Sequence, residues 1–505
     1  MNETIENTAL IRKKDEEILR LKERIKWLER ALFSSRSERV ISTHPDQGEF
    51  EDLLAELEDL SKELGQSEQI QDSKPKMKKQ RKKRRSLDEL IPEDLPREEI
   101  IIDVPENERT CPQTGKPFKR IGEEVTEKLA FKPGSYFVKR YIRPKYAHPT
   151  DSSYGVLCEP MINCAIPGSS FDESFTAAIG VDKCAYHLPI YRQQERMRNA
   201  GIEISRQTLS QHYMRGPLSL KPVFELMKKK ILEGKYIFTD DTSVKLQVKG
   251  KSKTVTGRMW IYISGGEKPA YTVFDFTVNR KAEHTVEFLK NFEGYVHADA
   301  YSGYDVLFKN ENITECACWM HVRRKFYEAE DGPVEYREEI LKLIQNLYRY
   351  ERVLSKAKPE DRLKHRKEKI EPIINKIFKK TNNLLTDSQY TILPRSKIRQ
   401  AITYLLNQKE ALKTFLTDPY VKPDNGTSER AIRPLAIGRK NWLFAGSKNG
   451  GEATAIWLSL IQTCRAMDIN PFAYLDDVLR KINATSDIES LLPDRWKAHQ
   501  QNIQK

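Results

Sequence analysis

Residues 236–248 read YIFTDDTSVKLQV, an apolar and β-branched run that contains two adjacent acids, Asp240 and Asp241. This composition is typical of a buried strand. A second apolar run, in GYVHADAYSGY at residues 294–304, ends at Asp299. Because alternate residues of a strand face opposite sides of a sheet, only one of Asp240 and Asp241 can point into a shared site. We therefore expect a carboxylate site at the strand ends.

The order of elements around these runs predicts an α/β core. Strand signals occur at residues 235–240, 243–248, 258–264 and 270–277. A helix signal follows at 282–291, and two further strand signals follow at 294–299 and 313–319. Three strands, a helix, a strand, a helix and a strand is the order of a ribonuclease-H-like fold, a mixed sheet with flanking helices. In that topology the end of the first strand lies next to the end of the fourth, so Asp240 and Asp299 are expected to meet.

A third acid, Glu429, opens the Arg- and Lys-rich stretch DNGTSERAIRPLAIGRKNWLFAGS at residues 424–447. Magnesium and manganese ions prefer oxygen ligands and an open, water-filled shell. Three carboxylates can hold two such ions, which activate the attacking oxygen and stabilise the leaving oxygen in a displacement at phosphorus. Without cations the acids would repel one another. Asp240, Asp299 and Glu429 therefore predict metal-dependent phosphodiester chemistry.

Charge and cysteine content limit the class of protein. The chain has 505 residues, enough for two to four domains, and a net charge of +13, to which KPKMKKQRKKRR at residues 74–85 brings nine basic residues and no acid. Its seven cysteines suit a reducing interior better than a disulfide framework. The N-terminus lacks the pattern of a secretory signal, and no apolar run approaches the length that crosses a bilayer. We expect a soluble, cytoplasmic protein with no membrane partner.

The first 98 residues predict self-association followed by an arm. Within residues 1–70, apolar residues recur at heptad spacing from Ile11 to Leu32 and at 3/4 spacing from Leu53 to Leu64, which is typical of a coiled coil and a second helix. Helices that pack on the protein's own body are the alternative. Residues 71–98 read as a basic arm that binds phosphates without reading sequence, or as a solvated linker. The candidate DNA contacts of the arm are Lys82, Lys83, Arg84 and Arg85.

Two small regions precede the core. Residues 99–167 are β-rich, and Cys111 begins an element similar to a zinc knuckle. The other candidate ligand positions hold Thr114, His148 and Asp151. Because a structural zinc ion normally takes four Cys or His ligands, zinc is not expected there. Residues 168–232 are helical, and NAGIEISRQTLSQHYM at 199–214 resembles half of a helix-turn-helix or, equally, a plain helical hairpin. Its candidate base readers are Arg206, Gln207 and Gln211.

The remainder divides into a core in two parts and two helical regions. Residues 233–332 and 421–450 are the parts of the catalytic core, 333–420 a charged helical insertion, and 451–505 a C-terminal helical region. Several cations near the acids are candidate phosphate contacts, with ion pairs to neighbouring acids as the alternative: Arg323, Arg324, Lys325, Arg430, Arg433, Arg439 and Lys440. His321 is expected either to contact DNA or to cap a helix, and Cys318 suits a core position better than a ligand position.

Five motifs occur in order along the chain: KCAYHLPIYRQQ, TDDTSVKL, HADAYSGY, CWMHVRRKF and SERAIRPLAIGRKNWLFAGS. With the zipper that ends in ALFSSRSERV and the terminal LLPDRWKAHQ, the chain resembles, over nearly its whole length, the transposases of the insertion-sequence sixty-six family, a branch of the DDE transposases. The resemblance implies catalytic and metal-binding roles for Asp240, Asp299 and Glu429, with two Mg²⁺ or Mn²⁺ ions. The family usually has Asp-Glu-Thr at the first motif, whereas this chain has Asp240, Asp241 and Thr242.

The resemblance also implies a reaction and its partners. A transposase hydrolyses DNA at the ends of its element and joins the freed 3′ hydroxyl to a target. The implied partners are double-stranded DNA (terminal inverted repeats and target), a second copy of the chain in a homodimer or higher oligomer, and accessory proteins of the same element, in the bacterial cytoplasm and associated with the nucleoid. Two alternatives are a structure-selective nuclease of the same fold and a dimeric DNA-binding regulator without catalysis.

Overall fold

A computed structural model describes nearly all of residues 164–503 and a few short stretches before them. The described residues are 56–57, 59–60, 134, 136–139, 145–147, 156–158, 164–250, 252–266, 270–387, 390 and 392–503. The chain divides into two compact units, Met1–Ile70 and Gln71–Lys505. In the first unit, the described residues are helical, and Leu57 and Leu60 are buried.

Several expectations fall outside the described residues. They concern the heptads of residues 11–32, the arm with Lys82, Lys83, Arg84 and Arg85, and the candidate zinc element with Cys111, Thr114, His148 and Asp151. Within the β-rich region, two short strands, β1 (Lys145–Ala147) and β2 (Val156–Cys158), pair antiparallel.

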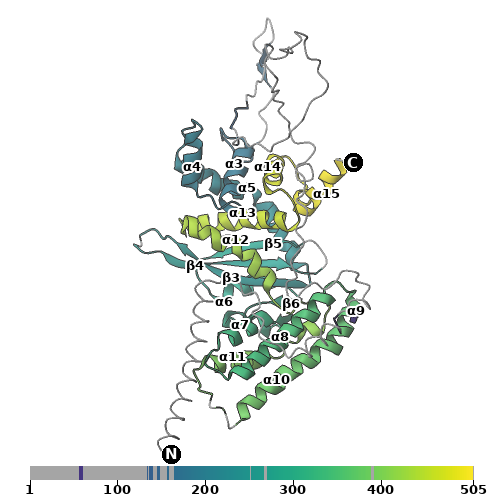
Figure 1. The fold of residues 1–505 in the computed structure, drawn as a ribbon. Helices are drawn as coiled ribbons and strands as arrows, with labels where there is room; N and C mark the ends of the chain where they lie inside the picture. Colours follow the sequence, from purple (N-terminus) through teal and green to yellow (C-terminus); the bar gives the residue numbers. More distant parts are fainter. Residues whose placement is uncertain are drawn as a thin grey trace, which may run out of the picture. The chain divides into compact units, whose positions relative to one another are not determined.

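A mixed sheet lies at the centre of the second unit (Figure 1). Its strands are β3 (Tyr236–Leu246), β4 (Val255–Ser264), β5 (Thr272–Thr277), β6 (Gly294–His297), β7 (Ile313–Cys316) and β8 (Phe444–Ala445). The order is β5-β4-β3-β6-β7, and β8 also pairs with β3. The β3–β4 and β4–β5 pairs are antiparallel, whereas β6 and β8 pair parallel to β3 and β7 pairs parallel to β6. A mixed sheet with flanking helices is the α/β architecture that the sequence predicted.

The pairing of β3 with β6 brings two distant segments together. Phe238 is paired with His297, and their rings stack with centroids 4.3 Å apart. Asp240 and Asp299 each lie two residues further along the chain. The predicted proximity of the first and fourth strand ends is therefore confirmed.

Two details of the sheet differ from the prediction. The signals at residues 235–240 and 243–248 belong to one strand, β3, because the pairing with β4 continues from Ile237 to Leu246. The helix expected between the fourth and fifth strands is also wrong. Two short 3₁₀ turns stand there, η3 (Ser302–Tyr304) and η4 (Leu307–Lys309). Tyr304 and Leu307 are both buried by these turns, so a full helix is not needed to cover the sheet.

One side of the sheet carries the helices α3 (Glu173–Cys184), α5 (Arg206–Leu232), α13 (Lys448–Ala466), α14 (Pro471–Lys481) and α15 (Pro493–Ile503) (Figure 1). Helix α13 also covers the edge strand β5. Phe274 N donates a hydrogen bond to Ser459 Oγ at 2.8 Å, and Thr272 N donates one to Thr463 Oγ1 at 2.9 Å. These bonds satisfy edge amides that would otherwise be open to pairing with another chain.

The helix pair α4 (Ile190–Asn199) and α5 is joined by a turn that contains Gly201, whose φ is +78°. Ser205 Oγ caps α5 by accepting from Thr208 N at 3.1 Å. Arg206 and Gln207, in the first turn of α5, are exposed. Further along this 27-residue helix one face is buried in the core, while the other face stays exposed, as at Gln211 and Leu218.

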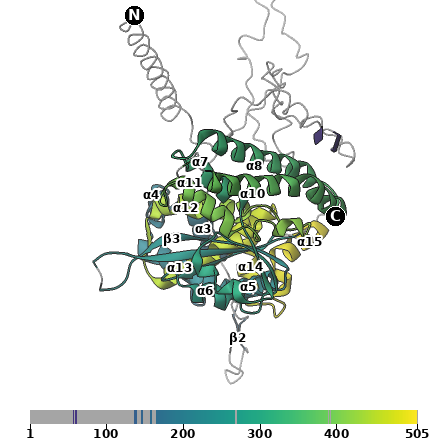
Figure 2. The ribbon, with the colours of Figure 1, turned by 90° about the horizontal axis from the view of Figure 1, so that it is seen from below.

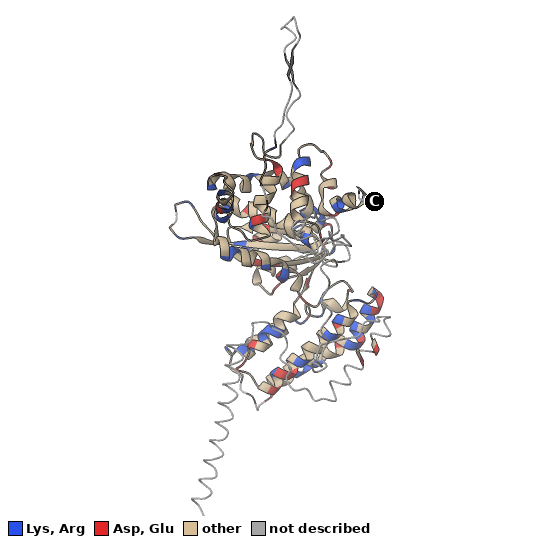
Figure 3. Ribbon diagram, turned by 45° about the horizontal axis from the view of Figure 1, so that its top comes forward, with Lys and Arg blue, Asp and Glu red and all other residues tan. Residues whose placement is uncertain are grey.

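The opposite side of the sheet holds α6 (Ala282–Leu289) and α7 (Trp319–Glu328), followed by the insertion: α8 (Val334–Leu354), α9 (Pro359–His365), α10 (Glu371–Thr386) and α11 (Lys397–Asn407). Helices α8 and α10 lie side by side in both views (Figures 1 and 2). Positions of both charge signs are dense on these helices (Figure 3). Among the described residues, no helix has the length and apolar character that a bilayer span requires.

The segment that leads from the insertion to α12 (Gly426–Trp442) is firmly held. The buried Arg366 pairs with Glu351 (Nε···Oε1 2.7 Å) and donates from Nη1 to the carbonyl oxygens of Phe415 and Asp418 at 2.6 and 2.9 Å. The Asp418 carboxylate in turn accepts from Tyr236 Oη on β3 at 2.9 Å. These contacts fix the connection between the insertion and the sheet.

Candidate active site

Asp240, Asp299 and Glu429 come from three elements: β3, the segment just after β6, and the first turn of α12. On β3, the neighbouring Thr242 Oγ1 accepts from Arg439 Nη1 of α12 at 2.7 Å. Because alternate residues of a strand share a face, Asp240 also lies on the α12 side. The charges of Asp299 and Glu429 both act on Asp240. The structure therefore brings the three predicted acids into one site.

The electrostatics of this site disfavour three ionised carboxylates. Burial, together with the charges of Asp299, Asp241 and Glu429, raises the pKa of Asp240 to about 7, although Asp241 N donates to Asp240 Oδ1 at 2.7 Å. Burial also raises the pKa of Asp299, and the nearby Arg280 opposes that rise. Near neutral pH, Asp240 is therefore poised to exchange a proton for a cation.

Two carboxylate oxygens in the site are buried without a hydrogen-bond partner, Asp299 Oδ1 and Glu429 Oε1. Buried carboxylate oxygens normally accept hydrogen bonds, so such atoms call for another positive partner. The two side chains nevertheless keep exposed fractions of 30% and 32%, which leaves access for water. Convergent oxygen donors with an open side suit hard divalent cations such as Mg²⁺ or Mn²⁺.

Asp241, one residue along β3, has different surroundings. Its side chain is 1% exposed and lies between two arginines. Arg280 donates to Asp241 Oδ1 from Nε at 2.9 Å and from Nη2 at 2.6 Å, and Arg258 Nη1 lies 3.0 Å from Oδ2. Two cations therefore balance its negative charge, which still contributes to the raised pKa of Asp240 and of Asp299.

Arg280 connects this buried pair to the site. Its Nη2 is 3.7 Å from Asp299 Oδ2. Its guanidinium lies over the Tyr301 ring, 3.6 Å from the centroid, and Tyr301 Oη donates to the carbonyl oxygen of Arg280 at 2.6 Å. Asp241 thus anchors an arginine that contacts the neighbouring candidate ligand.

The start of α12 is held against β3 and α7, which positions Glu429. Asn425, the residue before α12, donates from Nδ2 to Thr239 O at 2.8 Å and from its backbone N to Cys318 Sγ at 3.3 Å. Trp319 N, at the start of α7, donates to Pro423 O at 3.0 Å. Glu429 follows one turn into the helix fixed by these bonds.

Two residues of α7 complete the surroundings of Glu429. His321 Nε2 lies 3.4 Å from Glu429 Oε1, and Arg324 Nη2 lies 3.8 Å from Oε2. One ligand atom each of Cys318, His321 and Glu429 lies within 4.8 Å of the other two. The N-cap residue of α7 is Cys318, so His321 does not cap that helix. The i, i+3 spacing of Cys318 and His321 in CWMH is the signal that indicates a shared helix face.

The cations of α12 divide into two kinds. Arg430, Arg433 and Lys440 are exposed, and their spacing of three and seven residues places them along one face of the helix. Arg439 instead makes hydrogen bonds within the protein, since its Nη1 donates to Thr242 Oγ1 and, at 2.6 Å, to Ser243 O. The predicted DNA contact at Arg439 is thus a link between α12 and β3.

The other predicted contacts lie near aromatic rings. Lys325 Nζ is 4.8 Å from the centroid of Tyr404 in α11, and the Arg323 guanidinium is 5.9 Å from the centroid of Tyr327. The Arg206 guanidinium, at the start of α5, is 6.0 Å from the centroid of Tyr191. Arg206 and Gln207 lie in the first turn of α5, which supplies none of the three acids.

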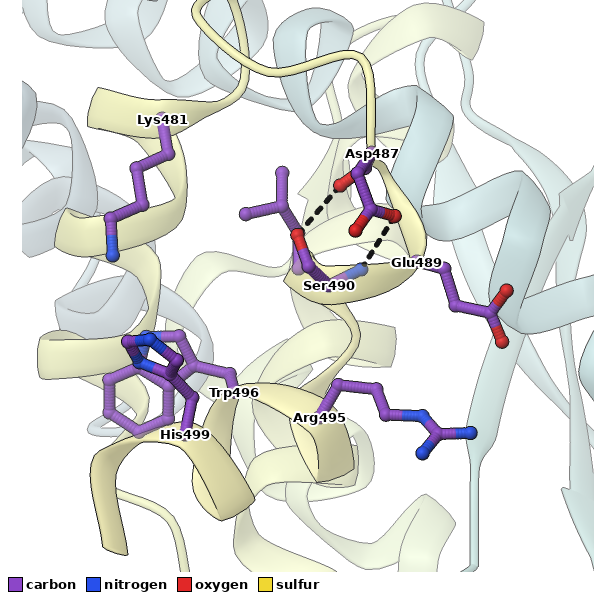
Figure 4. Close-up of a pocket in the computed structure, with 8 residues that line it drawn as sticks. Lys481, Asp487, Glu489, Ser490, Arg495, Trp496 and His499 are labelled. Atoms are coloured by element: carbon purple, nitrogen blue, oxygen red, sulfur yellow. Dashed lines mark hydrogen bonds between the residues drawn. The ribbon is translucent and has the colours of Figure 1, made fainter. Parts of the chain in front are cut away.

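A separate cavity of about 620 Å³ lies at the C-terminal helices (Figure 4). Its lining mixes both charge signs, with Lys481, Arg495, Asp487 and Glu489, and the His499 ring lies beside Trp496. Asp487 is occupied locally, because its Oδ1 accepts from Ser490 N at 3.2 Å. This cavity contains none of the three acids and does not extend the acidic site.

Comparison with known families gives matches along most of the chain. A model described as transposase IS66 family matches residues 168–453, and the IS66 C-terminal element matches 459–493. A model described as transposase C of IS166 homeodomain matches residues 20–100, and a zinc-finger binding domain of transposase IS66 matches 108–150. The last match weakens the expectation that zinc is not bound near Cys111.

Similar proteins from one organism align with this chain over most of both lengths, and their names state no activity. The uncharacterized protein y4hP of Sinorhizobium fredii (strain NBRC 101917 / NGR234) is 30% identical over 504 residues, which is 95% of this chain and 89% of the relative. The uncharacterized protein y4qI of the same organism is 30% identical over 510 residues, covering 97% and 91%. A third, y4jD, is 29% identical and covers 96% of both chains.

Proposed function

This chain belongs to the IS66 family of transposases, and we propose that it cleaves a DNA strand at the end of an insertion sequence and joins the freed 3′ hydroxyl to target DNA. The observation that carries the proposal is the convergence of Asp240, Asp299 and Glu429, two of which have a buried carboxylate oxygen without a hydrogen bond while their side chains stay partly exposed. We propose a ribonuclease-H-like assignment for the core as well. The strand order β5-β4-β3-β6-β7 supports it.

The three acids would act as the metal ligands. Two Mg²⁺ or Mn²⁺ ions held there would supply activation of the attacking oxygen and stabilisation of the leaving oxygen. Asp240 releases its proton when it becomes a ligand, because its pKa of about 7 lies within reach of neutral pH. Asp299 is oriented by Arg280, and Glu429 is oriented by the fixed start of α12. This chain's own residues thereby bring the ligands into position before DNA arrives.

Cations beside the acids would hold the DNA strands. Arg324 lies next to Glu429, and Arg430 and Arg433 continue along the exposed face of α12. Guanidinium groups suit phosphate oxygens because they can donate two parallel hydrogen bonds. Element ends and target DNA are the proposed partners, with self-association through the N-terminal heptads and accessory proteins of the element as further proposals.

A strand-transfer assay tests the proposal. Pre-cut duplexes that carry the inverted repeats flanking the gene are incubated with a plasmid target and Mg²⁺. The wild-type protein is expected to form joined product, and Asp299→Asn is expected to form none. Asp305→Asn is the matched control, because Asp305 is an exposed aspartate only six residues further along.

The same assay separates the alternatives. Cleavage of uncut ends without joining would identify a nuclease of the same fold. DNA binding without cleavage or joining, unchanged in Asp299→Asn, would identify a regulator. Joining that persists in Asp299→Asn at the wild-type rate would contradict the assignment of the acids.

A further inference from the structure

A groove outside the three acids lies between α7 and α11. It has a volume of about 390 Å³, within the range of ligand-binding pockets. It is lined by two cations, four uncharged polar side chains and a proline: Lys325, Arg399, Gln400, Thr403, Tyr404, Asn407 and Pro394. No carboxylate is part of this lining. We call it the α7–α11 groove.

The segment that supplies most of the groove lining has an excess of positive charge. Residues 388–409 contain four cations, Arg395, Lys397, Arg399 and Lys409, and no acid. By contrast α8, in the same insertion, carries four acids and four cations. The nearby Asp331 is occupied, since its carboxylate accepts from the backbone N of Lys397 at 2.7 Å and of Ile398 at 3.0 Å. The positive charge is thus a local property of this part of the insertion.

The groove begins next to the acidic site. Lys325 and His321 are four residues apart on α7, so they share a face and are separated by about 6 Å along the helix axis. His321 lies against Glu429, whereas Lys325 lies over the ring of Tyr404 in the groove. Arg324, the neighbour of Lys325, also approaches Glu429. A strand whose phosphate occupies the acidic site would therefore pass directly into the groove.

We propose that the α7–α11 groove binds the phosphodiester backbone of the DNA strand that leaves the active site, an inference that rests on the proposed function. Lys325 and Arg399 contact successive phosphates, and Gln400, Thr403 and Asn407 offer hydrogen bonds to phosphate or sugar oxygens. We assign these side chains to the backbone because the groove begins beside the site where a phosphate would be held; a contact with a base edge would instead show as a difference between two DNA sequences. The groove therefore contributes affinity and strand path without sequence preference, and the insertion has a role in holding substrate.

The test measures how DNA affinity depends on salt. Full-length protein binds two 40-base-pair duplexes, one with the element end and one of scrambled sequence, in Ca²⁺ over a series of salt concentrations. For Arg399→Gln and Lys325→Gln, the slope of log affinity against log salt is expected to become shallower by about 0.9 per lost contact on duplex, or about 0.7 if the strand there is single. The change should be equal for both duplexes.

Lys379→Gln is the matched control. Lys379 is an exposed lysine on α10 of the same insertion and does not line the groove. Its slope is expected to equal that of the wild type, and Arg399→Lys should keep most of the wild-type slope. Arg399 is exposed, so its replacement should leave the melting temperature unchanged. Wild-type slopes in both Arg399→Gln and Lys325→Gln would overturn the proposal.

Failure of the groove and failure of the proposed function give different results. If Arg399→Gln makes the salt slope shallower but the wild-type protein joins no ends, DNA binding by the groove is supported and the proposed strand transfer is contradicted. If the wild-type protein joins ends and the groove variants bind and join with unchanged salt dependence, only the proposal that the groove binds DNA is contradicted. A slope change for the element-end duplex alone would also overturn the proposal, because it would mean sequence reading.

Discussion

Asp240 and Asp241 are the same residue type on the same strand, yet they lie in opposite electrostatic surroundings. Asp240 faces α12, where the neighbouring charges are those of Asp299 and Glu429. Asp241 faces the other way and is enclosed by Arg258 and Arg280. One carboxylate lacks a cation and the other has two. The difference indicates that Asp240 is available as a ligand, whereas Asp241 is a structural ion.

The largest effect is expected from Asp240→Asn. Loss of one ligand oxygen should reduce cleavage and joining by at least about 10³-fold, since metal ions supply several kcal/mol of transition-state stabilisation. Without metal ions, in EDTA at pH 8, the free energy of unfolding of the variant should be no lower than that of the wild type. The reason is that burial and the neighbouring acids disfavour the charge that the substitution removes. Strand-transfer rates and urea unfolding check the two parts. A large loss of stability in Asp240→Asn would contradict the contrast between Asp240 and Asp241.

Asp241→Asn is expected to act mainly on stability. The change leaves Arg258 and Arg280 without their shared partner and should lower the free energy of unfolding by about 2 kcal/mol. This is below the range for fully buried pairs, because the two arginines keep 25% and 30% exposure. Asp241→Glu, the family's usual residue, restores the charge and serves as the control in urea unfolding. If Asp241→Asn kept full stability but lost metal binding, the two roles would be exchanged.

The pH dependence should follow Asp240. Its folded-state pKa, about 7, lies above the usual aspartate value, so the folded protein keeps a proton that the unfolded chain loses. This contribution to stability is present at acidic pH and is lost as pH rises through about 7. Mg²⁺ competes with the same proton, so its affinity should be about tenfold weaker at pH 6 than at pH 8.

Thermal melts with EDTA or Mg²⁺ at both pH values measure this competition. The upward shift of the melting temperature by Mg²⁺ should be larger at pH 8 and should largely disappear in Asp240→Asn. An equal shift at both pH values would show that Asp240 does not exchange a proton for the ion. The Asp241→Glu variant should behave as the wild type does.

The smallest effect is expected from Arg280→Lys. Arg280 contacts both Asp241 and the candidate ligand Asp299. Lysine keeps the charge but loses the two-nitrogen contact with Asp241 and the planar contact with Tyr301. Activity should fall by about tenfold, as for other residues that orient a metal ligand, with a higher Mg²⁺ requirement. Stability should fall less than in Asp241→Asn. An unchanged Mg²⁺ requirement would limit Arg280 to a purely structural role.

The sequence by itself was enough for the sheet and the family. Apolar β-prone runs before Asp240 and Asp299 predicted the strands, and their order predicted that two strand ends meet. Five ordered motifs indicated the family that the comparisons show. Local pattern was misleading at two places: it divided β3 into two strand signals, and it predicted a helix where two short turns lie between β6 and β7.

Only the tertiary structure decided how each charge is used. Alternation along β3 shows that Asp240 and Asp241 diverge, but the sequence does not show that Arg258 and Arg280 enclose one of them. Nor does it show that Arg439 is committed to β3, or that His321 lies against Glu429. The physical reason is that secondary structure follows from neighbours in the chain, whereas the charge state of a carboxylate depends on partners brought close by folding from distant positions.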